Sequence, residues 1–177
     1  MISAELHYGP MSLEHHSPEA VAQLIYASAP EMFELLFGQS AVQTIQDLVV
    51  RSHNRLSHRH VQIAAAGELV IGIATLLPAT ALQDNADYDS VLNVWARLRR
   101  QLAMGLILNR VLEQNYPADS FYIANLAVQA NYRGQGIGSQ LLQHCLAQAR
   151  SAGANQVFIS VDIHNPRAQK LYESLGF

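Results

Sequence analysis

Apolar and polar residues alternate with two different periods in the first half of the chain. A period of two is typical of strands, and a period of about 3.6 is typical of helices. Gly67-Glu68 separates two strand-like runs, which predicts a tight hairpin. Pro30 should interrupt the helical pattern because proline lacks the N–H that a helix interior needs. We expect strands over 2–8, 60–66 and 69–77, and helices from Pro18 to Pro30, from there to Gly38, and over 42–49.

The final third has the most regular pattern of the chain. A β-branched run of residues precedes a glycine-rich loop, and a helical pattern follows that loop. Asn165-Pro166 is typical of a helix start, because asparagine caps well and proline suits the first turn. The order strand–helix–strand predicts parallel pairing with a right-handed crossover. We expect strands over 121–128 and 156–162, and helices from Gly136 to about Ala152 and from Pro166 to Gly176.

Residues from about 81 to 117 lie between these two regular regions. Their opening is polar, and a helical pattern runs from about Val91 to Glu113. One stripe of this helix is apolar, and its arginines lie mostly off that stripe and are expected to form a solvated face. We predict one domain over 1–177, with a mainly helical insert at about 81–117. The stripe comprises Val91, Trp95, Leu98, Leu102 and Leu106, and the arginines are Arg97, Arg99 and Arg100.

Composition narrows the class of protein. Half of the 177 residues are hydrophobic and the net charge is −3, so the chain is expected to fold and to bind neither nucleic acid nor an anionic membrane. Cys145 is the only cysteine, which excludes an intrachain disulfide and favours a cytoplasmic location. The N-terminus does not resemble a signal peptide, and no apolar run reaches the ~18 residues of a membrane span. The eight histidines lack a well-placed carboxylate or cysteine partner, so we expect no metal site.

The clearest chemical signal is the run from Arg133 to Gly138, Arg-Gly-Gln-Gly-Ile-Gly, between a predicted strand and a predicted helix. Glycines allow the backbone to approach a ligand closely, and the free N–H groups of a helix start suit a phosphate or pyrophosphate. Arg133 adds a charged donor. A tight turn that needs glycine only for its geometry remains an alternative. The loop lacks the Gly-Lys-Ser/Thr of a P-loop, and its glycine spacing does not fit the dinucleotide fingerprint.

This loop fits the pattern R/Q-x-x-G-x-G and resembles the acetyl-CoA motif of the GNAT superfamily. The resemblance extends from Tyr122 to Phe177 and includes Asn125-Leu126-Ala127-Val128, which is similar to the central strand of that family. The run from Asn165 to Phe177 resembles its N-x-x-A-x-x-L-Y-x-x-x-G-F helix. The resemblance implies an α/β (α+β) fold, with a mixed, largely antiparallel sheet flanked by helices and a splayed central strand pair.

The resemblance also implies roles for particular residues. Acetyl-CoA would be the acyl donor and would need no metal. The backbone of Leu126, Ala127 and Val128, together with Asn165, would contact the pantetheine arm. Tyr172 would donate a proton to the leaving thiolate, unless it only packs in the core, and Asn165 could be only a helix cap. The pyrophosphate would be held by Arg133, Gly134, Gln135, Gly136, Ile137, Gly138 and Ser139.

The implied function is direct transfer of an acetyl group from acetyl-CoA to an amine, with a backbone N–H near Val128 at a strand bulge stabilising the oxyanion. The alternative is a CoA-binding regulatory module without turnover. Asn125 stands where many family members carry a glutamate, so the general base is unassigned, with Tyr122 or a water chain as candidates. Family members usually continue past Gly-Phe with further strands. Whether a longer chain, a second copy in a homodimer or an open edge follows Phe177 is left open, as is the acceptor amine.

Overall fold

The structure is a computed structural model, and it describes residues 6–105, 116–161 and 165–177. A five-stranded sheet in the order β1-β2-β3-β4-β5 runs through the molecule. Neighbouring strands are antiparallel except for β4 and β5, which are parallel. The expected mixed, largely antiparallel sheet is therefore confirmed. The strands are β1 (His7–Pro10), β2 (Val61–Ala66), β3 (Leu69–Pro78), β4 (Ser120–Val128) and β5 (Gln156–Ile159).

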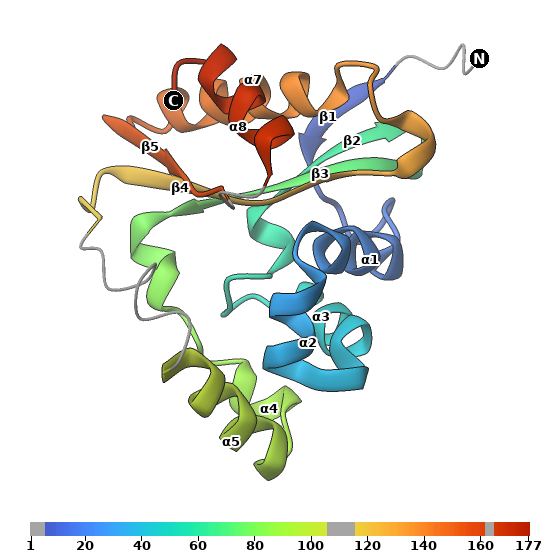
Figure 1. Cartoon of the computed structure of the whole chain (residues 1–177), viewed down its shortest axis with the longest axis vertical. Coiled ribbons are helices and arrows are strands. Elements are labelled where there is room, and N and C mark those ends of the chain that lie inside the picture. Colours follow the sequence, from blue (N-terminus) through green and yellow to red (C-terminus); the bar gives the residue numbers. More distant parts are fainter. Residues whose placement is uncertain (1–5, 106–115, 162–164) are drawn as a thin grey trace.

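Helices cover both faces of this sheet (Figure 1). The N-terminal helices α1, α2 and α3 lie on one side, and the C-terminal helices α7 and α8 lie on the other. α4 and α5 extend beyond α2 toward the far end of the molecule. The bounds are α1 (Pro18–Ser28), α2 (Pro30–Phe37), α3 (Ala41–Val49), α4 (Tyr88–Val91), α5 (Val94–Ala103), α7 (Ile137–Ser151) and α8 (Pro166–Ser174).

The central strand β3 is buried along almost its whole length. Because helices pack on both sides of the sheet, this strand reads as a continuous apolar run instead of an alternating one. Ile73 faces the core beneath α1 and α3, and Ala74 faces the core beneath α7. β3 thereby supports β4, the strand that borders the candidate site. The predicted hairpin is present, with Gly67 at a φ of 61°.

Three predicted elements have different bounds in the structure. The strand expected over 2–8 is β1, which covers His7–Pro10, and residues 2–5 of that prediction lie outside the described residues. The helix expected from Val91 to Glu113 is interrupted, because Leu92 is extended and Asn93 begins a new helix. The Asn93 side chain accepts the N–H of Ala96 at 2.9 Å, a capping bond for which asparagine is well suited. Residues 106–113 of that prediction lie outside the described residues. β5 ends at Ile159, so the strand predicted over 156–162 is shorter than expected.

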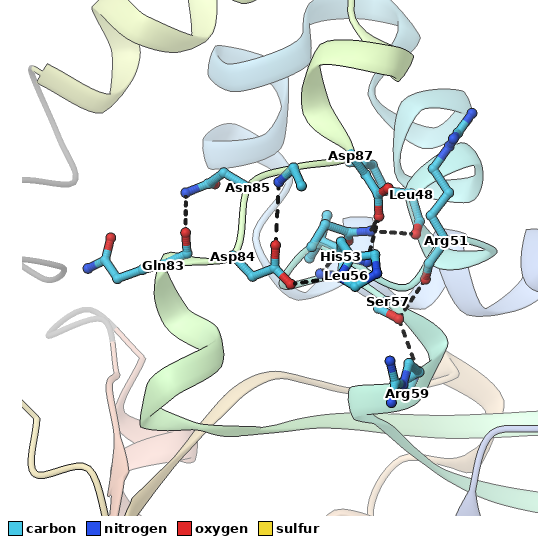
Figure 2. Close-up of polar contacts among 12 residues, drawn as sticks. Leu48, Arg51, His53, Leu56, Ser57, Arg59, Gln83, Asp84, Asn85 and Asp87 are labelled. Atoms are coloured by element: carbon cyan, nitrogen blue, oxygen red, sulfur yellow. Dashed lines mark hydrogen bonds and ion pairs between the residues drawn. The ribbon is translucent and has the colours of Figure 1, made fainter.

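A polar network fixes the segment that precedes α4 (Figure 2). The Asp87 carboxylate accepts the backbone N–H of His53 at 2.7 Å and the Asn54 side-chain amide at 2.9 Å. Asn54 is fully buried, and it also donates to the Leu48 carbonyl at 3.0 Å. These hydrogen bonds hold the pKa of Asp87 below its ordinary value, although desolvation opposes them. The start of α4 is therefore tied to the end of α3.

The solvated face predicted for the α5 arginines is confirmed for Arg97 and Arg99, which are exposed, but not for Arg100. Arg100 is half-buried, stacks on the Tyr88 ring with 3.9 Å between its guanidinium carbon and the ring centroid, and donates to Asn85 at 2.6 Å. The apolar stripe of the same helix faces solvent instead. The described residues contain no helix of sufficient length and apolarity to span a bilayer.

Candidate functional site

The candidate site lies where β4 and β5 separate. In the described part of the chain their parallel pairing covers Ser120–Ile123 and Gln156–Ile159, whereas β4 continues to Val128. The last part of β4 therefore has a backbone edge that β5 does not use. Such an edge can accept an extended ligand as an added strand. Leu126, Ala127 and Val128, the residues expected to contact pantetheine, all lie on this edge.

A bulge bends β4 at the start of this free edge. Ala124 pairs with Thr75 and Ala127 pairs with Ile73, so two residues of β4 oppose one residue of β3. The bulged residues are Asn125 and Leu126. The bulge was expected near Val128, and the structure places it two to three residues earlier in the strand. The candidate oxyanion donors are consequently the backbone N–H groups of the bulge itself.

Asn125 has the only positive φ, 49°, among the non-glycine residues of the described chain. Asparagine tolerates this left-handed conformation better than most residues. Its side-chain amide donates to the Ser28 hydroxyl at 3.1 Å. Ser28 in turn donates to the Ile25 carbonyl at 2.6 Å, at the end of α1. Asn125 thus joins the bulge to α1, and its side chain carries no charge.

The predicted phosphate loop connects β4 to α7 and leaves its glycines open. Gly134 and Gly136 both have a φ of 80°, and a Cβ added to either would meet no heavy atom within 4 Å. Gly136 precedes the first turn of α7 without a side-chain cap, so the first N–H groups of that helix have no partner within it. This combination of open space and unpaired donors fits a pyrophosphate.

The other loop residues contribute in different ways. The Ile137 side chain is buried in the core, so only its backbone can face a ligand. A Cβ on Gly138 would lie at ordinary contact distance, 3.7 Å from Leu171 and 3.9 Å from Val128. Gly138 therefore packs between α8 and β4. Gln135 is exposed and Ser139 is half-buried.

Arg133 reaches back from the loop to the free edge of β4. Its Nε donates to the Val128 carbonyl at 2.9 Å, and its side chain is exposed. The guanidinium is thus located between the glycine loop and the strand edge, where it can approach an anion bound to the loop.

We expect Arg133→Ala to weaken CoA binding by about 1–3 kcal/mol, because one charge-assisted donor is lost while the backbone donors remain. Isothermal titration with CoA measures this change. Arg150→Ala is the matched control, since Arg150 is exposed at the opposite end of α7. Equal affinities for the two variants would remove Arg133 from the phosphate site.

Tyr172 is half-buried on α8, against the core beneath α7. Burial, and secondarily the nearby Tyr122, raises the pKa of its phenol above the ordinary value. Tyr172 therefore keeps its proton at neutral pH, as a general acid must. Its hydroxyl makes no hydrogen bond to another residue in the described part of the chain. Its ring packs edge-on against Phe177, with centroids 6.2 Å apart.

Two further hydroxyl groups border the gap between β4 and β5. Tyr122 is buried on β4, and its hydroxyl hydrogen-bonds the Ser160 hydroxyl just beyond the end of β5. The Tyr116 ring packs on Tyr122 and Phe158, with centroid distances of 5.5 Å and 4.9 Å. Burial, with the Tyr122 phenol as a second cause, raises the pKa of Tyr116.

Ser160 and Tyr116 were missed by the sequence analysis. A usable signal existed for Ser160, because Tyr122 pairs with Phe158 and alternate residues of a strand share a face. Ser160 follows Phe158 by two positions. Nothing in the sequence pattern marks Tyr116.

Asn165 caps α8, as predicted, by accepting the Ala168 N–H at 3.1 Å. Its contact with pantetheine stays a prediction. Cys145 is buried in α7, and burial raises the pKa of its thiol to about 12. Among the residues that the structure describes, no group of three or more His, Cys, Asp or Glu side chains could hold a metal ion.

Comparison with known proteins agrees with this geometry. N-alpha-acetyltransferase 30 of Schizosaccharomyces pombe is 41% identical over 56 residues, which cover 32% of this chain and 37% of that protein. The ribosomal protein bS18-alanine N-acetyltransferase of Escherichia coli K12 is 37% identical over 59 residues, which cover 33% of this chain and 40% of that protein. The matches thus span less than half the length of these relatives.

A solved structure resembles almost the whole chain. The N-acetyltransferase from Staphylococcus aureus Mu50 superposes with a TM-score of 0.75 and 20% identity, covering 97% of this chain and 90% of the other. At this identity the similarity establishes the fold. The family model for the Acetyltransferase (GNAT) family matches residues 23–177, most of the chain. The chain therefore belongs to the GNAT acetyltransferase family.

Proposed function

We propose that this protein transfers the acetyl group of acetyl-CoA to the α-amine at the N-terminus of a peptide or protein. The observation that carries acetyl transfer is the free, bulged edge of β4 leading into the open glycine loop. The edge accommodates an extended arm and the loop accommodates a pyrophosphate, which are the two recognisable parts of CoA. Family membership supports the same chemistry.

Different residues of this chain would bind acetyl-CoA and assist the transfer of its acetyl group. Leu126, Ala127 and Val128 would bind the arm through their backbone, and Arg133 and the loop from Gly134 to Ser139 would hold the pyrophosphate. Acetyl-CoA supplies a reactive thioester. Bulge N–H groups would stabilise the charge that develops on its carbonyl oxygen. Tyr172 would donate its proton to the departing sulfur.

The absence of a carboxylate at Asn125 favours a weakly basic acceptor. A lysine amine has a pKa of about 10.4, and making it neutral at pH 7 costs roughly 4–5 kcal/mol. An α-amine has a pKa of about 7.7–8.0, so the same step costs only about 1–1.4 kcal/mol. Two side-chain hydrogen bonds lie near the separation of β4 and β5, one between Asn125 and Ser28 and one between Tyr122 and Ser160. These four side chains are amides and hydroxyl groups and carry no charge. A relay through the Tyr122 and Ser160 hydroxyl groups would then pass the proton to solvent water, its final acceptor.

The relatives support this acceptor class. One is named an N-alpha-acetyltransferase, and the other is named for the alanine of a ribosomal protein. A cytoplasmic location is part of the proposal and rests on the single cysteine.

A matched pair of peptides tests the acceptor. One peptide has a free N-terminus and no lysine, and the other differs from it in having an acetylated N-terminus and a lysine in place of one internal residue. We expect CoA release only with the first peptide, and mass spectrometry should locate the added acetyl group on its α-amine. Ellman's reagent can follow the released thiol, because Cys145 is buried and its raised pKa keeps it protonated.

The other outcomes distinguish the parts of the proposal. Turnover with the capped lysine peptide or with a polyamine would overturn the α-amine acceptor and leave acetyl transfer intact. Binding of acetyl-CoA without thiol release from any amine in a broad panel would favour the regulatory module.

A further inference from the structure

The outward face of α5 is apolar. Val94, Trp95, Leu98 and Leu102 are 72%, 78%, 47% and 62% exposed. At about 100° per residue, these four side chains fall within one sector of the helix, opposite Ala96 and Ala103, which face the protein. We call these four residues the α5 stripe. Scattered apolar residues are common on surfaces, but a continuous stripe of this size marks an interaction site.

The orientation of α5 is set by its polar residues. Arg100 lies on Tyr88 and bonds to Asn85, and Arg97 Nε donates to the Leu92 carbonyl at 2.9 Å. Turning the stripe inward would break these contacts and place Arg100 in solvent on the outer side. The Asp87 network holds the segment before α4 (Figure 2). The Asn93 cap holds the start of α5. The exposed stripe is thus a consequence of specific bonds.

Positive charge borders the stripe on both sides. Arg97 and Arg99 flank it and are both exposed, and α5 contains no acidic residue. Beside Arg99 there is also a cavity of about 390 Å³, lined in part by Tyr26, Glu34 and Val42. A binding partner should therefore present apolar side chains flanked by acidic ones, with a projecting side chain available for the cavity.

A second copy of this chain does not meet that requirement. In an antiparallel pair of α5 helices, the Arg97 side of one helix faces the Arg97 side of the other, and the two Arg99 sides also face each other. In a parallel pair, the Arg97 side of one helix faces the Arg99 side of the other. Both flanks of α5 carry arginine, so either arrangement brings like charges together. A membrane also fits poorly. Arg100 is turned inward, which leaves Arg97 and Arg99 to face anionic lipid, fewer than the roughly four to eight cations of a lipid-binding cluster.

We propose that the α5 stripe docks an amphipathic helix of another protein, whose apolar face is bordered by Asp and Glu. The stripe has the length of one short helix, about 15 Å for ten residues. Helix recognition of this kind relies on apolar anchors spaced three to four residues apart, a spacing that Val94, Leu98 and Leu102 show. This surface lies on α5, and β4 and the glycine loop are separate elements, so docking would hold a partner while leaving the candidate site open.

The test uses a synthetic helix of about 21 residues with a leucine stripe flanked by glutamate, a length at which helices form readily. Trp95 is the only tryptophan of the chain and lies within the stripe, so its fluorescence reports docking directly. We expect a blue shift on titration with this peptide. A peptide with lysine in place of glutamate should bind about tenfold more weakly, because attractive flanking pairs become repulsive.

Two variants distinguish docking on the α5 stripe from nonspecific binding to exposed leucine side chains. Leu98→Gln should abolish the shift, whereas Leu69→Gln should preserve it, because Leu69 is equally exposed at 48% but lies on the hairpin. Unchanged thermal unfolding shows that both variants are folded. The proposal is overturned by the absence of a shift with the glutamate peptide, by equal binding of both peptides, by a dimer in light scattering that Leu98→Gln dissociates, or by sedimentation with phosphatidylserine vesicles that Leu98→Gln abolishes.

Discussion

Gly136→Asp is expected to eliminate measurable CoA binding. The side chain would enter the open space at the start of α7, where a Cβ now meets nothing within 4 Å. A carboxylate about 4 Å from a phosphate charge repels it by about 4 kcal/mol at an effective dielectric constant of about 20, which is close to a thousandfold in affinity. It would also attract the N–H groups that the pyrophosphate needs. Calorimetric titration with CoA measures the loss.

Gly153→Asp is the control for this variant. Gly153 has a φ of 83°, close to the 80° of Gly136, and also has no neighbour within 4 Å of an added Cβ. It follows the last turn of α7, at the opposite end from the loop. The two substitutions impose the same charge and similar backbone strain, so only the change at Gly136 should affect CoA. If both variants are folded and bind CoA with the affinity of the parent, the glycine loop does not bind the pyrophosphate and is only a turn.

Tyr172→Phe is expected to lower kcat by about 10²–10⁴-fold, the usual range for loss of a general acid. The hydroxyl acts on the departing sulfur mainly in the transition state, so the Kd for acetyl-CoA should change by less than about tenfold. The ring remains, and with it the packing against Leu171, Leu175 and Phe177. Rapid-mixing kinetics with an accepted peptide and direct acetyl-CoA titration give the two quantities separately.

Tyr116→Phe provides the comparison for that variant. Tyr116 is another phenol whose pKa burial raises, and its ring also packs on Tyr122, but it has no assigned role in proton transfer. A large loss of kcat in Tyr172→Phe and a small loss in Tyr116→Phe would distinguish proton donation from packing. Near-parental turnover of Tyr172→Phe would make Tyr172 a core residue.

Local signals predicted most of the fold. Gly67-Glu68 predicted the hairpin because the turn requires little more than those two residues. Asn165-Pro166 predicted the start of α8 because a cap and a first-turn proline act within a few residues. The parallel pairing of β4 and β5 followed from the order of strands and helix. These features depend on short stretches of sequence, and the structure confirms them.

Features that depend on distant partners could not be predicted. Helical spacing located the apolar stripe of α5, but the direction of that stripe depends on Tyr88 and Asn85, which hold Arg100. The alternating pattern of β4 gives no sign of its bulge, which arises only in pairing with β3. The bulge was expected from the family resemblance alone, and near Val128 instead of at Asn125 and Leu126. The contact of Asn125 with Ser28 joins residues far apart in the chain. A single sequence contains no local trace of such contacts.

The short parallel pairing of β4 with β5 also has a consequence for the order of folding. Only four residue pairs join these strands, and the crossover through α7 must close before any of them can form. Non-local parallel pairing of this kind is slow, so β5 and α8 should dock after the antiparallel strands have assembled. CoA would contact elements on both sides of this late step, and a ligand at about 100 times its Kd adds about 2.7 kcal/mol to the folded state. Bound acetyl-CoA would then stabilise the folded state of the last third of the chain. Without CoA, this part of the protein would be the first to be cleaved by proteases.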